Sequence, residues 1–129
     1  MTLKNKKILI VIGGGIAAYK SLDLIRLLKK NGVKIKTILT KSGREFVTPL
    51  SLSTLTKSKT FENMFDSESE TEIDHIELSR WADIILVMPT TANFMSKLSI
   101  GKAEDLATTV LLAADKDIPV SYTHLTLPT

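Results

Sequence analysis

Residues 7–20, KILIVIGGGIAAYK, decide the fold of this 129-residue chain. The stretch from Ile8 to Ile12 is an unbroken apolar run, which is typical of a parallel strand covered on both faces. Three glycines follow, where a strand-to-helix turn needs positive φ and no side chain. From Ile16 onward the apolar residues recur at helical spacing. A glycine turn that opens a helix offers backbone N–H groups and the positive end of the helix dipole, so it predicts a phosphate site.

The composition is that of an ordinary soluble domain. Hydrophobic residues make up 43% and charged residues 24% of the chain, and the length suits one domain with its own core. No apolar stretch approaches the roughly 20 residues of a membrane span, and lysines interrupt any signal-peptide run. There is no cysteine, and no histidine cluster or carboxylate pair has metal-ligand spacing. We therefore expect a cytoplasmic protein without a disulfide or a metal site.

The charge distribution argues against nucleic acid as a partner. The net charge is +3, but the basic residues are spread over the first third of the chain, while residues 62–77 are strongly acidic. Aromatic residues are only 5% of the chain and do not alternate with basic ones. A nucleic-acid-binding surface usually needs a concentrated basic patch, so this class is disfavoured.

The rest of the chain alternates between predicted strands and helices. Strands are expected over residues 33–40, 60–64, 84–88 and from 118, and helices over 46–57, 74–82, 94–100 and 103–114. This alternation predicts an α/β fold, a Rossmann-like, doubly wound parallel sheet in three layers. Ligands of such sheets bind at the carboxyl ends of the strands. The segments expected there are 13–18, 40–44 and 89–93, all rich in Gly, Ser, Thr or Asn.

The glycine turn also satisfies G-x-G-x-x-A, the permissive dinucleotide fingerprint. NAD needs an acidic residue at the end of the second strand, where this chain has Thr40 followed by Lys41 and Ser42. For NADP, the only supporting residues are Lys41 and Arg44. A mononucleotide whose phosphate is held by hydroxyls and backbone amides fits better, and a merely tight turn is the alternative.

His75 is the histidine best placed for chemistry. Asp74 and Glu77 have the spacing of a capping-box variant, which puts His75 in the first turn of a helix. The helix dipole would there favour the neutral imidazole, a possible general base, while the two carboxylates oppose this effect. The alternative is a surface histidine in a polar linker, which spacing alone slightly favours.

Three further positions allow two interpretations each. Asn93 follows a buried strand and is either a ligand-binding amide or, as helix chemistry favours, the N-cap of the next helix. Thr108 and Thr109 lie inside a predicted helix and face either solvent or a ligand. Trp81 is expected in the core.

Four motifs in order resemble the homo-oligomeric flavin-containing cysteine decarboxylase family. They are GGGIAAYKS, DHIELSRWAD, PTTANFMSKLSIGKAEDL and the threonine pair at 108–109. The resemblance covers about residues 5–120, almost the whole chain. It implies FMN as the cofactor, bound between the subunits of a trimer that in many members assembles into a dodecamer.

The resemblance also assigns site residues. Those matching the family's flavin-contacting segments are Gly14, Gly15, Ile16 and Ala17 near the phosphate, Thr40 and Ser42 after the second strand, Thr90, Thr91, Ala92 and Asn93 in the P-x-x-A-N segment, and Thr108 in the threonine pair. His75 matches the active-site histidine of the family.

The family's chemistry implies an activity. It is FMN-dependent decarboxylation of 4'-phosphopantothenoylcysteine to 4'-phosphopantetheine in coenzyme A biosynthesis, through a thioaldehyde and an enethiol, with no net redox change. The rivals are a lantibiotic-type peptidyl-cysteine decarboxylase and a non-catalytic flavin-binding regulatory subunit of the same fold. A related flavin prenyltransferase lacks the histidine and is less favoured.

The last residues depart from the family. After the strand near residue 118, the family continues with a P-x-M-N-x-x-M-W segment and a flap cysteine, and commonly with a fused phosphopantothenate–cysteine ligase domain. This chain instead ends SYTHLTLPT, which matches nothing in the family. We therefore expect an FMN-binding domain at 1–120, incomplete at its C-terminus, and a foreign tail at 121–129. The chain alone is then expected to lack the substrate clamp and the reducing acid.

Overall fold

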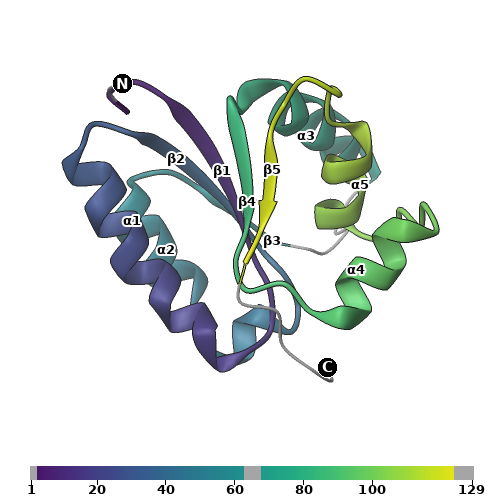
Figure 1. Ribbon diagram of the computed structural model, residues 1–129, viewed down its shortest axis with the longest axis horizontal. Coiled ribbons are helices and arrows are strands. Elements are labelled where there is room, and N and C mark those ends of the chain that lie inside the picture. Colours follow the sequence, from purple (N-terminus) through teal and green to yellow (C-terminus); the bar gives the residue numbers. More distant parts are fainter. Residues whose placement is uncertain (1–2, 63–67, 124–129) are drawn as a thin grey trace.

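A parallel five-stranded sheet in the order β3-β2-β1-β4-β5 forms the centre of the chain (Figure 1). The computed structural model describes residues 3–62 and 68–123, except for the side chains of residues 68–74. The strands are β1 Lys7–Ile12, β2 Lys34–Leu39, β3 Thr60–Glu62, β4 Ile84–Val87 and β5 Val120–Tyr122. From β1 the chain steps outward to β3, then crosses to β4 on the other side of β1. This order confirms the predicted doubly wound sheet.

The apolar run that follows Lys7 is the central strand. Between Ile8 and Ile12 no side chain is more than 6% exposed. β1 pairs with β2 from Lys7↔Lys34 to Ile12↔Leu39, and on its other edge with β4 from Ile8↔Ile84 to Val11↔Val87. A strand with two strand neighbours and two covered faces can be apolar at every position, which explains the unbroken run.

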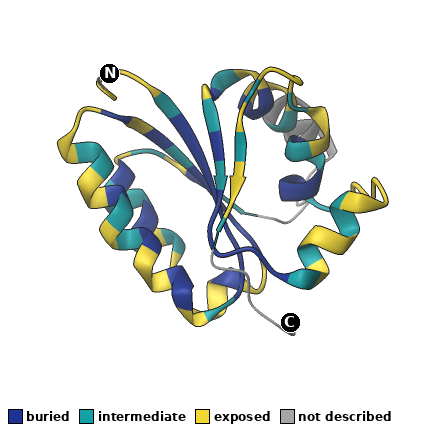
Figure 2. Cartoon of the chain, viewed as in Figure 1, coloured by how far each residue is buried: buried dark blue, intermediate teal, exposed yellow. Residues whose placement is uncertain are grey.

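Helices cover both faces of the sheet, so the chain has three layers. The helices are η1 Ile16–Tyr19, α1 Lys20–Lys30, η2 Gly43–Glu45, α2 Pro49–Thr56, α3 Glu68–Trp81, α4 Ala92–Ser99 and α5 Leu106–Ala113. α1 and α2 lie on one face, and α3 and α5 on the other (Figure 1). Where their side chains are described, the sheet-facing sides of these four helices are buried and their outer sides exposed (Figure 2).

Alternate residues of β1 divide the core into its two halves. Ile10 packs with Ile25 of α1 and Leu52 of α2, whereas Leu9 packs with Leu78 of α3 and Val110 of α5. Successive side chains of a strand point to opposite faces, so one strand supplies both halves. Each fully buried Leu or Ile side chain contributes about 1.5–3 kcal/mol through removal from water.

α3 corrects one sequence-based expectation. The helix begins at Glu68, so the predicted start at Asp74 is wrong and His75 lies in the second half of the helix. The dipole argument for His75 therefore fails, because that field falls off within the first turn. The acidic stretch before Asp74 contains few apolar residues, and for this reason the sequence favours a linker there. Glutamate is nevertheless a good helix former, and its charge suits a helix start.

The remaining elements follow the predicted order. The helix predicted over residues 46–57 begins at Pro49, which suits a first-turn position, with Thr48 as N-cap. The predicted third strand ends at Glu62, and its last two predicted residues, 63 and 64, lie outside the described part of the chain. β5 extends to Tyr122, which pairs with Val87. In the described ranges, no helix is both long and apolar enough to span a bilayer.

Candidate functional site

A cavity of about 440 Å³ opens at the carboxyl end of the sheet. It lies between β1 and β4, where the strand order reverses, and Val11 and Val87 of these strands form part of its lining. The other lining residues come from the loops after β1, β2 and β4, from α4, and from the loop before α5. The three strand ends predicted to form a ligand site therefore do meet at one cavity, as expected at a topological switch point.

The glycine turn forms a wall made of backbone. A Cβ atom on Gly13 would lie 2.5 Å from the carbonyl oxygen of Pro89, and one on Gly14 would lie 2.5 Å from Cβ of Ser42. Of the three glycines in this turn, only Gly15 has a positive φ, 149°. The predicted need for positive φ thus holds at Gly15, while Gly13 and Gly14 are required because other loops pack directly against them.

The loop after β2 is fixed by the Thr40 side chain. Its Oγ1 accepts a hydrogen bond from the Gly43 N–H at 3.0 Å, and the residue is only 7% exposed. This bond holds the turn so that Lys41 and Ser42 line the cavity beside the glycines. A cation and a hydroxyl next to exposed backbone form a suitable environment for an anion.

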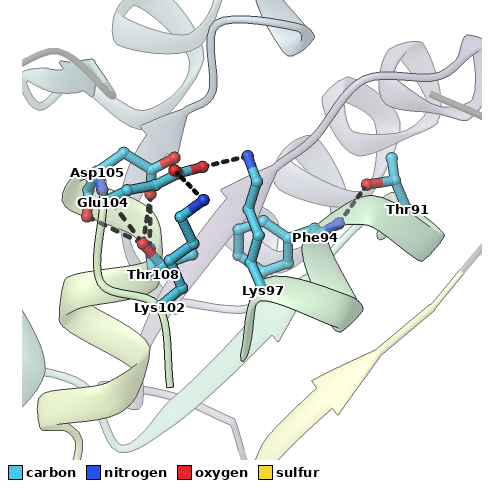
Figure 3. A network of polar contacts seen from close by, with 7 residues as sticks. All are labelled: Thr91, Phe94, Lys97, Lys102, Glu104, Asp105 and Thr108. Atoms are coloured by element: carbon cyan, nitrogen blue, oxygen red, sulfur yellow. Dashed lines mark hydrogen bonds and ion pairs between the residues drawn. The ribbon is translucent and has the colours of Figure 1, made fainter. Parts of the chain in front are cut away.

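The loop after β4 corrects a second expectation. The N-cap of α4 is Thr91, whose Oγ1 accepts a hydrogen bond from the Phe94 N–H at 3.0 Å (Figure 3). Asn93 is therefore not the cap but the second helical residue, and it lines the cavity with Phe94. Because Thr91 satisfies the helix end, the Asn93 amide has no capping role to perform.

A network of charged side chains contributes Lys97, Glu104 and Asp105 to the cavity lining (Figure 3). The ammonium groups of Lys97 and Lys102 both contact the Glu104 carboxylate, the latter at 3.3 Å. Hydrogen bonds from Lys97 and then from Lys102 lower the pKa of Glu104. Asp105 begins α5, and its Oδ1 accepts hydrogen bonds from the Thr108 N–H at 2.9 Å and the Thr108 hydroxyl at 2.7 Å.

Sequence reasoning missed part of this lining. Lys97, Glu104 and Asp105 all line the cavity, but none was proposed as a site residue. Two signals could have revealed them. Lys97 lies four residues after Asn93 and hence on the same helix face, and Asp105 with Thr108 has capping-box spacing.

The predicted site residues fall into two groups. Those that line the cavity are Gly14, Thr40, Ser42, Thr91 and Asn93. Those outside its lining are Gly15, Ile16, Ala17, Thr90, Ala92, Thr108 and His75. Ile16 is 73% exposed, Thr108 is fully buried beneath Asp105, and His75 is partly exposed on α3.

The cavity suits an anionic organic cofactor. Its volume lies within the roughly 300–1,000 Å³ of small-molecule sites. One wall is a backbone cradle, which a Cβ atom on Gly13 or Gly14 would fill. The other lining groups include hydroxyls, one amide, one aromatic ring and two lysines. Among residues 3–62 and 68–123, no group of three or more His, Cys, Asp or Glu side chains could hold a metal ion.

Fold and cavity together define a doubly wound α/β protein with a ligand site at the switch point of its sheet. Residues 1–125 match the family described as Flavoprotein, so the chain belongs to the flavoprotein family. It is 42% identical over 120 residues to the coenzyme A biosynthesis bifunctional protein CoaBC of Vibrio vulnificus (strain YJ016). That alignment covers 93% of this chain but only 30% of the length of the relative.

Solved structures agree with this assignment. A PPC decarboxylase variant complexed with pantothenoylaminoethenethiol is 25% identical, with a TM-score of 0.75 over 94% of this chain and 69% of that chain. The FMN-dependent cysteine decarboxylase SpaF is 26% identical, with a TM-score of 0.76 over 92% and 66%. The expected family and its Rossmann-like fold are thereby confirmed.

Proposed function

We propose that this chain is the flavin-binding part of an enzyme that decarboxylates 4'-phosphopantothenoylcysteine to 4'-phosphopantetheine in coenzyme A biosynthesis, with FMN as cofactor. The observation that carries the proposal is the cavity at the switch point, which brings together the family's glycine turn and its P-x-x-A-N segment. The similarity to a coenzyme A biosynthesis protein supports this substrate over the peptidyl-cysteine and non-catalytic alternatives.

The proposed cofactor-binding set comprises the residues that the family motifs assign. They are Gly14, Gly15, Ile16 and Ala17 toward the phosphate, Thr40, Ser42 and the segment 90–93 around the rest of the cofactor, and Thr108. When bound, FMN would take two electrons from the cysteine side of the substrate, so that the resulting thioaldehyde can accept the electrons left behind as CO₂ departs.

The chain's own residues prepare the site in three ways. The close approach of Gly14 to Ser42 keeps one wall free of side chains, so that a ligand contacts backbone directly. The Thr40 hydroxyl holds the loop after β2, and Thr91 holds the start of α4. These hydrogen bonds orient Ser42 and Asn93 before a ligand arrives, which lowers the entropic cost of binding.

His75 is the proposed proton acceptor, because an imidazole can take up and release a proton near neutral pH. It does not line the cavity of a single chain. A site shared between subunits would account for this separation. We therefore propose a homo-oligomer, either a trimer or a dodecamer built from trimers, in which His75 of one subunit serves the cavity of another.

The proposal extends to the whole protein. The chain spans about 30% of the length of the curated relatives it matches, and a phosphopantothenate–cysteine ligase domain is proposed as its fused or separate partner. Residues 1–120 are proposed as the flavin-binding unit, with 121–129 as a foreign tail. A cytoplasmic location is part of the same proposal, and a chain without cysteine is compatible with it.

Two measurements test the proposal. Titration of FMN into the 129-residue chain, followed by flavin fluorescence, is expected to show saturable binding. For turnover, residues 1–120 replace the matching region of the Vibrio vulnificus CoaBC protein, and CO₂ released from 4'-phosphopantothenoylcysteine is trapped and quantified. The same chimera with His75→Asn is the control, expected to keep its flavin and release no CO₂. Absence of FMN binding, or a folded yellow chimera without turnover, would contradict the proposal.

A further inference from the structure

Two parts of the cavity lining differ in chemistry. Gly13, Gly14 and Ser42, from the loops after β1 and β2, present backbone and a small hydroxyl. Phe94 and Lys97 come from α4 and share one face of that helix, since they are three residues apart. A small polar cradle suits a phosphate, whereas an aromatic ring beside a cation suits a flat, electron-rich group.

The ammonium group of Lys97 carries the surplus charge of its network. Lys97 and Lys102 both contact Glu104, so the three side chains sum to one positive charge. Lys102 does not line the cavity and its side chain is 54% exposed, whereas Lys97 lines it and is 28% exposed. Because Lys102 can neutralise Glu104 alone, Lys97 can turn its charge to a ligand without leaving the carboxylate unpaired.

The other charged groups of the cavity lining are less suited to contact the flavin ring. Lys41 is next to Ser42 in the loop after β2 and not on α4. The Asp105 carboxylate accepts two hydrogen bonds from Thr108, which hold it as the cap of α5. Among the lining residues described, Lys97 is therefore the cation that shares a helix face with Phe94.

We propose that Lys97 stabilises the reduced, negatively charged ring of the bound flavin and thereby favours its reduction. This inference rests on the proposed function. Oxidised FMN that gains two electrons and one proton from the cysteine-derived substrate carries one negative charge on its ring, while the substrate is oxidised by the same two electrons. A partly buried ammonium group nearby favours that state more than an exposed one, because solvent screens it less.

Sulfite tests this proposal without substrate. The sulfur lone pair forms a bond to flavin N5, and the displaced electron pair leaves the ring negatively charged, as in reduction. The flavin-loaded chain is titrated with sulfite while the yellow absorbance is followed, and its midpoint potential is measured. Lys97→Met is expected to weaken sulfite binding about tenfold, which corresponds to about 30 mV in a two-electron potential. Lys97→Arg retains the charge and is expected to restore both values.

Lys102→Met is the matched control. It removes the other lysine that contacts Glu104, at a site outside the cavity lining. Glu104 then pairs with Lys97 alone, so sulfite affinity is expected to fall, but by less than in Lys97→Met, which removes the cation from the cavity. Lys97→Gln provides a second neutral variant if Lys97→Met does not fold, as judged by circular dichroism.

Three outcomes are distinguishable. Unchanged sulfite affinity and potential in Lys97→Met would overturn the inference and leave the proposed function intact. A loss of affinity for FMN but not for riboflavin would also overturn it, because Lys97 would then pair with the phosphate. If the wild-type chain binds no FMN at all, the proposed function fails, and this inference fails with it.

Discussion

Gly14 and Ser42 are in such close contact that a Cβ atom on Gly14 would lie 2.5 Å from Cβ of Ser42. Such a distance is shorter than non-bonded carbon atoms tolerate, so any side chain at position 14 must displace the loop after β2. The contact joins the first and second strand ends at the wall of the cavity. Glycine is therefore required at position 14 because of this packing contact, and not because of its backbone φ.

Gly14→Ala is expected to weaken FMN binding about tenfold or more and to lower the free energy of unfolding by about 1–3 kcal/mol, as overpacking does. Isothermal titration with FMN and urea denaturation measure the two effects. Gly32→Ala is the control, because Gly32 has φ of 79° in the turn between α1 and β2. It is expected to lose stability but not FMN affinity. Wild-type FMN affinity in Gly14→Ala would contradict the role of this contact.

Thr37→Val is expected to stabilise the chain by about 1 kcal/mol or slightly more, because it removes a buried polar group without a partner. Thr37 lies in β2, fully buried, and its hydroxyl oxygen has no hydrogen-bond partner among the described residues. Thr60→Val is the matched control, since the Thr60 hydroxyl donates to the Pro49 carbonyl at 3.0 Å. That variant is expected to be destabilised. Urea denaturation measures both, and a destabilised Thr37→Val would show that the hydroxyl is satisfied.

The Glu104 network predicts a specific pH dependence. Hydrogen bonds from Lys97 and Lys102 lower the pKa of the Glu104 carboxyl from its ordinary value of 4.5. Since the pKa in the folded state is below that in the unfolded state, the stabilisation is complete above about pH 4.5 and is lost as the pH falls through the folded value.

Glu104→Gln is therefore expected to have a slightly lower melting temperature than wild type at pH 7, and the difference should vanish in acid. Because the carboxylate is solvent-accessible, the difference should also shrink in high salt. Thermal scans between pH 3 and pH 7, at low and high salt, measure it. A difference that stays constant over this range would mean that Glu104 acts through packing instead of charge.

The fold could be predicted because its determinants are local. The apolar run before Gly13 and the alternation of strands with helices are visible in sequence, and parallel strands bring their carboxyl ends together. The ends of helices are harder to predict from the sequence. Thr91 and Asn93 are both good caps, and only the backbone shows that the chain enters the helix at Thr91. Residues 68–72 are all polar, so hydrophobic periodicity gives no sign of a helix there.

The charged side of the cavity could not be predicted for a different reason. Lys97 and Glu104 meet across the connection between α4 and α5, which turns at Gly101 with φ of 70°. Their contact depends on the path of that connection, and periodicity carries no information about it. A capping box could place Asp105 at the start of a helix, but not at the edge of a cavity.

The separation between His75 and the cavity leads to a prediction about assembly. In the chimera, His75→Asn is expected to keep FMN but lose turnover, and Asn93→Leu is expected to lose FMN while keeping His75. Each variant alone should be inactive. If the site is shared between subunits, mixed oligomers contain cavities with an intact flavin and a histidine from the neighbouring chain, so mixing after dissociation should restore CO₂ release. Size-exclusion chromatography checks that mixed oligomers form. Mixed oligomers that stay inactive would contradict a site shared between subunits, because complementation requires only that both halves of the site survive in different chains.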